Sequence, residues 1–274
     1  MILTATGTFT LADRVLAFVK KVRKLGFRAA VTWARGRSTG RRQARVSLKG
    51  AGIDLLLRPG TSDWTVMEDV FVHGDYDIAQ WPRQAGFLRE HYEAILASGD
   101  VPIIIDCGAN IGCASIHFAQ LFPKARVLAI EPEPDNFALL RANLSPFPLA
   151  TPIRAAISDR VGTLFLQSGD GQPWGWATVE DDASETVVET VTIPDLVRSE
   201  PRARLLVVKI DVEGAEKMLF RANTDWTREA PLIVVEMHDW LDWGRGSGHA
   251  VLSCLTQTKR EYLQRRENLF SFRC

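Results

Sequence analysis

Two stretches of the chain end apolar runs with side chains that can do acid–base chemistry. The first is KIDVEGAE and the second is VVEMHDW, and each follows a run typical of a buried strand. Carboxylates and an imidazole at such a place can remove a proton from a bound substrate. The ionisable side chains in these two stretches are Lys209, Asp211, Glu213, Glu216, Glu236, His238 and Asp239.

Asp211 and His238 are the leading predictions for a general base. His238 is the only histidine at a strand end expected to face the site, and its ordinary pKa of about 6.5 suits proton transfer. The alternative is a histidine that only hydrogen-bonds a carboxylate or stacks on Trp240. Glu213 and Glu216 lie at an expected helix start, where carboxylates favour the helix dipole. Glu216 is interpreted as structural, and the role of Glu213 stays open among the catalytic predictions.

A divalent cation is the third interpretation of these strand ends. Asp211, Glu236 and His238 together form an oxygen-rich set with one imidazole, which suits magnesium or manganese. Three potential ligands from two strands are weak evidence for a metal site. We therefore predict no metal, and a mechanism with a general base alone is preferred. Lys209 is predicted to form an ion pair with one of the nearby acids.

A glycine-containing stretch, IIIDCGANIG, follows another predicted strand. Gly108 and Gly112 permit backbone angles that other residues avoid, and Asn110 tolerates the left-handed region. Such a loop lets a ligand lie against the main chain. Glu131 ends the next strand at about 20 residues from the loop, where an acid can accept hydrogen bonds from two ribose hydroxyls. Loop and acid together predict a nucleoside site.

The nucleoside is predicted to be S-adenosylmethionine. The dinucleotide fingerprint G-x-G-x-x-G is absent, and the pattern is D-x-G-x-N-x-G, which disfavours NAD. Asp106 places a carboxylate near the loop, where it attracts an ammonium or sulfonium group and repels a pyrophosphate. Its alternative role is to bond the loop's own amides, and both roles are compatible.

The elements that must position these residues alternate between apolar strands and helices after residue 100. This order predicts an α/β fold with a doubly wound, mostly parallel sheet, whose ligands bind beyond the carboxyl ends of the strands. The predicted strands are 101–106, 125–131, 151–159, 203–211, 231–238 and 268–274, and the predicted helices are 113–122, 134–144, 213–222 and 249–266.

An N-terminal extension precedes this pattern, with residues 1–98 as a basic helix and cap region and residues 99–274 as the cofactor-binding domain. The first fifty residues hold twelve Lys or Arg and one acid, Asp13. Residues 11–35 are predicted to form an amphipathic basic helix that either contacts an anionic membrane surface or acidic partner, or simply packs on the domain. A β-hairpin is expected around residues 49–52.

Composition excludes several classes of protein. The chain has no apolar run long enough for a membrane span and no signal-peptide pattern, and its four cysteines lack paired spacing, so a cytoplasmic protein with reduced thiols is expected. No nucleic-acid-binding module or base-methylation motif is present, which disfavours RNA and DNA as partners. The cysteines are Cys107, Cys113, Cys254 and Cys274.

Several runs resemble the FkbM family of S-adenosylmethionine-dependent methyltransferases. They are IIIDCGANIGCASIHFA, VLAIEPEPDNFALLRANL, AAISDRVGTLFL, VTIPDL and LLVVKIDVEGAEKMLF, in this order, within about residues 60–240. The resemblance implies the Rossmann-like class I fold and O-methylation of a hydroxyl on a sugar, glycolipid, polysaccharide or polyketide-type product. By motif it implies cofactor contacts at Asp106, Gly108, Asn110, Gly112 and Glu131, with adenine near Ala156, Ile157, Ser158 and Asp159.

Two further expectations concern the rim of the site. Residues 169–185, rich in glycine, acid and tryptophan, are predicted to form a mobile loop in which Trp174 and Trp176 stack on a sugar or simply close the loop. Tyr76 is expected near the cofactor. Ile193 and Pro194 depart from a leucine common in the family, which is expected to shift a helix start only. The rival functions are an NAD-linked oxidoreductase and a catalytically silent nucleotide-binding scaffold.

Overall fold

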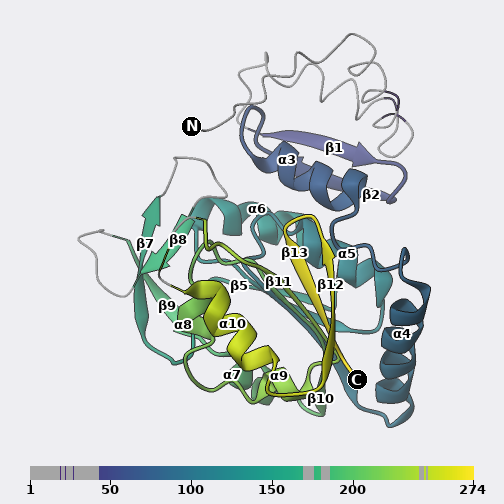
Figure 1. The fold of residues 1–274 in the computed structure, drawn as a ribbon. Helices are drawn as coiled ribbons and strands as arrows, with labels where there is room; N and C mark the ends of the chain where they lie inside the picture. The colour runs from purple at the N-terminus through teal and green to yellow at the C-terminus, as the bar shows by residue number, and fades with distance from the viewer. Residues whose placement is uncertain are drawn as a thin grey trace, which may run out of the picture. The chain divides into compact units, whose positions relative to one another are not determined.

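A computed structural model describes residues 43–168, 176–179, 186–240, 244 and 246–274, together with Val19, Val22 and Phe27. The chain divides into two compact units between Gly74 and Asp75 (Figure 1). This division falls before the boundary expected at residues 98 and 99. The predicted basic helix lies almost wholly outside the described residues, and its role stays a prediction.

The described part of the first unit is a β-hairpin followed by helical turns. Strands β1 (Ala44–Leu48) and β2 (Ile53–Leu57) pair antiparallel, which confirms the predicted hairpin around residues 49–52. Their alternate side chains are buried, as the period of a strand requires. Helix α3 (Asp63–Glu68) continues into the single π-helical turn η2 (Asp69–His73).

The second unit is built on a seven-stranded sheet of order β12-β13-β11-β10-β3-β4-β5 (Figure 1). Its five strands from β11 to β5 run parallel, and β13 pairs antiparallel with both β11 and β12. The predicted doubly wound, mostly parallel sheet is confirmed. The strands are β3 (Val101–Cys107), β4 (Arg126–Ile130), β5 (Ala150–Ile153), β10 (Ala203–Ile210), β11 (Leu232–Glu236), β12 (Arg260–Arg265) and β13 (Asn268–Arg273).

Helices cover both faces of this sheet, which explains why its central strands are apolar over most of their length. Apolar side chains of α7 to α10 join a core with alternate residues of β3, β4, β10 and β11. Helices α4, α5 and α6 lie across the sheet from α10 in Figure 1. The helices are α4 (Pro82–Ala97), α5 (Cys113–Leu121), α6 (Pro134–Leu144), α7 (Ile193–Ser199), α8 (Glu216–Leu219), α9 (Trp226–Glu229) and α10 (Ser247–Leu255).

A smaller sheet of order β6-β9-β7-β8 follows β5. The single strand predicted at 151–159 is therefore two strands, because the chain leaves the large sheet after β5 and pairs with β9. Much of the predicted loop at 169–185, including Trp174, lies outside the described residues, and only the backbone of Trp176 is described. The strands are β6 (Ala156–Ile157), β7 (Thr163–Ser168), β8 (Trp176–Val179) and β9 (Val187–Val191).

Two predicted helices are wrong in extent. The helix expected over 249–266 ends at Leu255, and β12 follows it. Arg260 explains the change, because its buried guanidinium donates to main-chain oxygens of Thr227, Ala230 and Ser271 only when this segment pairs with β13. The helix expected over 213–222 shrinks to α8, between turns.

Two expectations about the chemistry of the whole chain can be compared with the structure. The four cysteines, all of them within the described residues, are not joined by disulfide bonds. In the part of the chain that is described, helices are too short or too polar to cross a lipid bilayer.

The residues Ile193 and Pro194, which depart from the family pattern, lie at the start of a helix. Helix α7 begins at Ile193, directly after Thr192, whose hydroxyl accepts a hydrogen bond from the Asp195 amide.

Candidate active site at the carboxyl edge of the sheet

The register of the parallel strands brings the predicted site residues to one edge. Cys107 pairs with both Ile130 and Ile210, so β3, β4 and β10 end at the same level. Ile210 pairs in turn with Val235 of β11. The residues that follow these strand ends therefore lie along one line at the carboxyl edge, which is where doubly wound sheets bind ligands. These residues are Gly108, Glu131, Asp211 and Glu236.

The glycine loop has the backbone conformation that its sequence predicts. Gly108, Asn110 and Gly112 all have positive φ, at 77°, 50° and 94°. A Cβ on Gly108 would lie 1.8 Å from the carbonyl oxygen of Asp211. The glycine is thus required by the neighbouring main chain, whereas the sequence had suggested the approach of a ligand. This contact packs the glycine loop directly against the strand end that carries Asp211.

Glu131 joins the loop to the next strand through its carboxylate. Its Oε2 accepts the amide of Asn110 at 2.8 Å, while Oε1 accepts the amide of Glu133 at 3.0 Å and Nδ2 of Asn136 at 3.3 Å. A carboxylate has about four acceptor positions, so one remains, on Oε2. Burial raises the pKa of Glu131 to about 7, despite these hydrogen bonds. A ribose hydroxyl that donates to Oε2 would favour the ionised form.

Asp106 lies beneath the loop and is 0% exposed. Ser115 donates to its Oδ2 at 2.6 Å, and Lys209 Nζ lies 3.1 Å from Oδ1. Neither partner is a loop amide. The carboxylate has no exposed face in this structure, so its contact with the cofactor stays a prediction, and the structure shows it as the counter-charge of Lys209.

Lys209 links the two halves of the site. It donates to the carbonyl oxygen of Gly108 at 2.7 Å and lies 3.4 Å from Oδ2 of Asp211, which confirms the predicted ion pair. Burial lowers the pKa of Lys209, but the charge of Asp106 outweighs it, so the pKa lies well above its ordinary value. Tyr76 is buried beside this group, with its ring centre 5.9 Å from Nζ.

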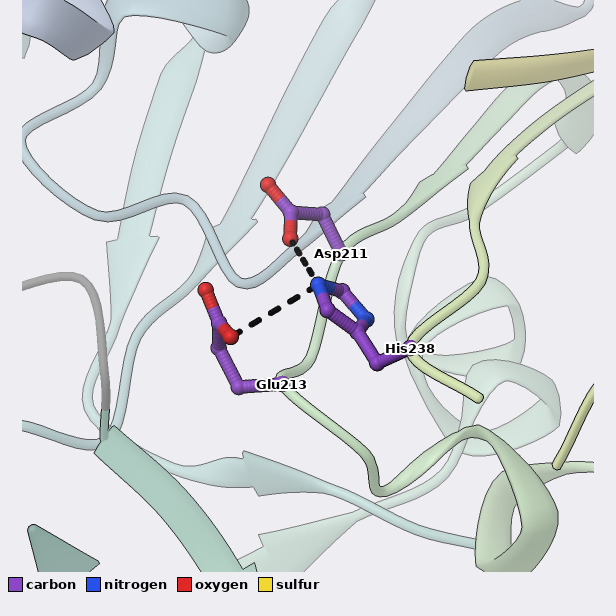
Figure 2. Close-up of side chains that lie close together, drawn as sticks. All are labelled: Asp211, Glu213 and His238. Carbon is purple, nitrogen blue, oxygen red and sulfur yellow. Dashed lines mark ion pairs between the residues drawn. The ribbon is translucent and has the colours of Figure 1, made fainter. Parts of the chain in front are cut away.

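His238 and four carboxylates form a cluster at the ends of β10 and β11, and Figure 2 shows Asp211 and Glu213 beside the imidazole. Glu216 contacts Nδ1 at 2.7 Å, and Asp211, Glu213 and Glu236 lie 3.7, 3.6 and 3.5 Å from Nε2. The predicted neighbourhood of the two strand ends is thus found. The interpretation of Glu216 as structural agrees with its contact, because it orients the imidazole. His238 also lies beside Trp240, with ring centres 6.2 Å apart.

Glu213 is held in place by an uncommon backbone conformation. Its φ is 50°, in the left-handed region that few residues other than glycine adopt, and Gly214 follows with φ of 94°. The turn directs the Glu213 carboxylate toward His238 before α8 begins, as Figure 2 shows. Strained residues of this kind gather at functional sites.

The cluster shifts the proton affinity of its members. Burial lowers the pKa of His238, but the hydrogen bond with Glu216 and the nearby carboxylates of Glu236 and Asp211 outweigh it and raise the pKa to about 11. Burial and the charge of Asp211 raise the pKa of Glu213 to about 8. Burial and Asp211 likewise raise the pKa of Glu236. In this arrangement the imidazole holds its proton at neutral pH, and a carboxylate is the better proton acceptor.

The residues implied to lie near adenine surround the start of the small sheet. Ala156 and Ile157 form β6, and Ser158 and Asp159 follow it, all of them buried. Arg221 donates to both carboxylate oxygens of Asp159, at 2.8 and 2.9 Å. This pair lowers the pKa of Asp159. Their contact with adenine stays a prediction.

No role was predicted for several residues that hold the site together. Ser115 was visible only as a polar residue in an apolar helix start, and Asn136 and Arg221 carry no local motif. A separate hollow lies between α4 and the end of α5, against Tyr92, Leu96 and Phe122. None of the predicted site residues lines that hollow.

Comparison with known proteins supplies the family. Residues 106–266 match the family described as methyltransferase FkbM domain. The hexuronic acid methyltransferase AglP of Haloferax volcanii is 30% identical over 141 residues, which cover 51% of this chain and 57% of that protein. The 2-O-methyltransferase NoeI of Sinorhizobium fredii is 27% identical over 173 residues, covering 56% of this chain and 70% of NoeI.

A third relative is the 31-O-demethyl-FK506 methyltransferase FkbM of Streptomyces tacrolimicus. It is 30% identical over 188 residues, which cover 56% of this chain and 70% of that protein. The residues of this chain that match the family include the glycine loop, Glu131 and the whole His238 cluster. The resemblance drawn from the sequence is confirmed, and with it a domain of the S-adenosylmethionine-dependent methyltransferase class. This chain belongs to the methyltransferase FkbM family.

Proposed function

We propose that the protein transfers a methyl group from S-adenosylmethionine to a hydroxyl of a carbohydrate. The observation that carries the proposal is the His238 cluster, which lies at the same sheet edge as the glycine loop and Glu131. Lys209 bonds the loop at Gly108 and pairs with Asp211, so the two parts are joined directly. A donor bound on the loop is thereby next to groups that can deprotonate an alcohol.

The cofactor is proposed to bind across the loop. Oε2 of Glu131 has an acceptor position for a ribose hydroxyl. The buried side chains from Ala156 to Asp159 are proposed to lie along the adenine ring. The acidic strand ends favour the positive sulfonium and ammonium groups by simple electrostatics. S-adenosylmethionine brings the methyl group already activated, as a substituent of a sulfonium.

Methyl transfer is a displacement in line with the sulfur. A bond forms between the acceptor oxygen and the methyl carbon, the bond from carbon to sulfur breaks, and the sulfonium leaves as a neutral thioether. The acceptor's proton must go to a base, which typically contributes about 10² to 10⁴ in rate. Glu213 is the proposed base, because its pKa of about 8 suits proton transfer near neutrality. His238 balances the charge of Glu213, and the charge of Asp211 helps to raise its pKa.

The acceptor class is inferred from the relatives and from the rim of the site. Two relatives carry names that specify hexuronic acid methylation and 2-O-methylation. Trp240 is 70% exposed and lies beside His238, where its face can stack on the apolar face of a sugar ring. A polyketide-type acceptor is the second candidate, because the third relative is a methyltransferase of demethyl-FK506.

A transfer assay tests the proposal. The full chain is incubated with S-adenosylmethionine labelled in its methyl group and with oligosaccharides that contain hexuronic acid, and labelled products are identified by mass spectrometry. An O-methyl sugar is expected from the wild type. Glu213→Gln should reduce transfer by about 10² or more while S-adenosylmethionine still binds. Glu200→Gln is the matched control, because Glu200 pairs with Arg126 before β10 begins.

The same protein separates the rival functions. Calorimetric titration should show binding of S-adenosylmethionine and none of NAD, and the reverse would favour an oxidoreductase. A catalytically silent scaffold would also bind S-adenosylmethionine, in the wild type and in Glu213→Gln. It differs from a methyltransferase in that the wild type would transfer no methyl group to sugars or to polyketide-type alcohols.

A further inference from the structure

Nε2 of His238 is a buried polar atom without a hydrogen bond among the described residues. The side chain of His238 is 1% exposed, and three carboxylate oxygens face Nε2 at 3.5 to 3.7 Å. These separations exceed the 2.7 to 2.9 Å of a charged hydrogen bond. A single N–H also has only one direction in which to donate. Nε2 of His238 therefore lies among three carboxylate oxygens at distances that suit an ion bound between them.

The other ring nitrogen fixes the direction in which Nε2 points. Nδ1 donates its hydrogen to Oε1 of Glu216 at 2.7 Å, and the side chain of Glu216 is fully buried. A carboxylate behind the imidazole is the usual partner of a histidine that binds a metal, because it fixes the ring and makes the opposite nitrogen a stronger ligand. Nε2 faces the oxygens of Asp211, Glu213 and Glu236, and a metal ion that replaces its proton would meet these carboxylates and take the Nε2 lone pair as a ligand.

We propose that Asp211, Glu213 and His238 hold a divalent cation, magnesium or manganese. One ligand atom from each residue lies within 4.8 Å of the others. Magnesium lies about 2.1 Å from its ligands in an octahedron, so neighbouring ligand atoms are about 3 Å apart and opposite ones about 4.2 Å. The separations of Nε2 from Asp211 and Glu213, 3.7 and 3.6 Å, lie between these values. Carboxylate oxygens with one imidazole suit these ions.

The charge of the cluster favours such an ion. Four carboxylates surround His238, and Lys209 is the cation paired with one of them, Asp211. Glu236 lies 3.5 Å from Nε2 but is not one of the three proposed ligands. The proposed ligands therefore differ from those considered from the sequence, because Glu213 replaces Glu236 beside Asp211 and His238.

The cation has an open side toward solvent. The side chains of Asp211 and Glu213 are 26% and 23% exposed, whereas His238 is buried. An octahedral ion with three protein ligands keeps positions for water or for an acceptor oxygen. The role of the cation rests on the proposed function, because it would bind the acceptor hydroxyl and make it more acidic.

Manganese binding tests the proposal without cofactor or acceptor. The full chain, freed of metal with a chelator and then dialysed, is titrated with Mn²⁺, and the free ion is followed by electron paramagnetic resonance. One saturable site is expected, and Mg²⁺ should compete for it. Glu213→Gln and His238→Gln should each weaken Mn²⁺ binding by at least about tenfold. Glu200→Gln, at the opposite end of β10, should bind Mn²⁺ as the wild type does.

The outcomes separate this proposal from the methyltransferase activity. Wild-type protein that binds no Mn²⁺ up to about 1 mM overturns the cation site, even if it transfers methyl groups in the presence of chelator. Equal binding by wild type and both cluster variants also overturns it, because the ion is then elsewhere. Loss of binding in folded Glu213→Gln, with circular dichroism unchanged, supports the site even if no acceptor has been found.

Discussion

Glu131 combines two tasks in one carboxylate. It holds the loop through the Asn110 amide, and its remaining acceptor position is proposed to bind a ribose hydroxyl. Its raised pKa, about 7, arises mainly from burial. The ionised form is the one that binds a hydroxyl donor best, so cofactor affinity and the protonation of Glu131 are linked.

The first prediction concerns the pH dependence of cofactor binding. As pH falls below 7, Glu131 takes up a proton, and the affinity for S-adenosylmethionine should fall toward tenfold per pH unit. Glu131→Gln should bind about 10- to 100-fold more weakly at pH 8 and lose this dependence. Calorimetric titrations at pH 6, 7 and 8 measure both. An affinity of the wild type that does not change with pH would contradict the link.

The second prediction concerns the buried pair of Asp106 and Lys209. Lys209→Met leaves a buried carboxylate without its counter-charge and should lower the free energy of unfolding by about 3–5 kcal/mol. The double variant with Asp106→Asn should recover part of this loss, because no buried charge remains. Urea unfolding measures the change, and a loss below about 1 kcal/mol in the single variant would show that the pair is unimportant.

The helices and strands that follow a local sequence pattern could be predicted. The apolar strands and the glycine loop were predicted, and so was the convergence of Asp211 with His238, because parallel strands end at one edge. The partner of His238 Nδ1 was not predicted, because Glu216 reaches it only through the turn at Glu213. The pairing of β12 also depends on distant main chain, which no local pattern reveals.

The third prediction concerns the contact between the loop and β10. Gly108→Ala places a methyl group against the carbonyl of Asp211 at a positive φ, and should cost at least about 2 kcal/mol of stability. Because the same contact positions Asp211, cofactor binding should weaken too. Gly86→Ala in α4 is the control, since a Cβ there meets nothing within 4 Å. Equal stability of the two variants would show that the loop adapts.

At the scale of the whole molecule, the His238 cluster should make stability depend on pH. His238 has a pKa of about 11 when folded and about 6.5 when unfolded, so its contribution is complete below pH 6.5 and is lost as pH rises toward 11. Glu213, with a folded pKa of about 8, holds a proton that the unfolded chain has lost above about pH 4.5, so stability again falls with rising pH.

The fourth prediction follows from these two shifts, which have the same sign. The free energy of unfolding, measured by urea in the presence of chelator, should fall from pH 6.5 to pH 9. His238→Gln should flatten this slope, although Glu216, Glu236 and Asp211 still face the position. A wild-type stability that rises over this range would contradict the protonated imidazole.

The fifth prediction concerns the two compact units. Every residue proposed to contact the cofactor lies in residues 75–274. A chain of these residues should therefore bind S-adenosylmethionine with the affinity of the full protein, as measured by calorimetry. The basic N-terminal segment is proposed to act on an anionic surface or acidic partner, so its removal should change binding to anionic vesicles instead. A loss of cofactor binding would place part of the site in the first unit.

A crystal structure of the full chain with S-adenosylhomocysteine would show whether the glycine loop and the His238 cluster form one active site. The ribose is expected on Oε2 of Glu131 and the sulfur on the side of Asp211, Glu213 and His238, with open space between the sulfur and these groups for an acceptor hydroxyl. A nucleoside bound away from the glycine loop, or a sulfur that faces away from the cluster, would contradict the account.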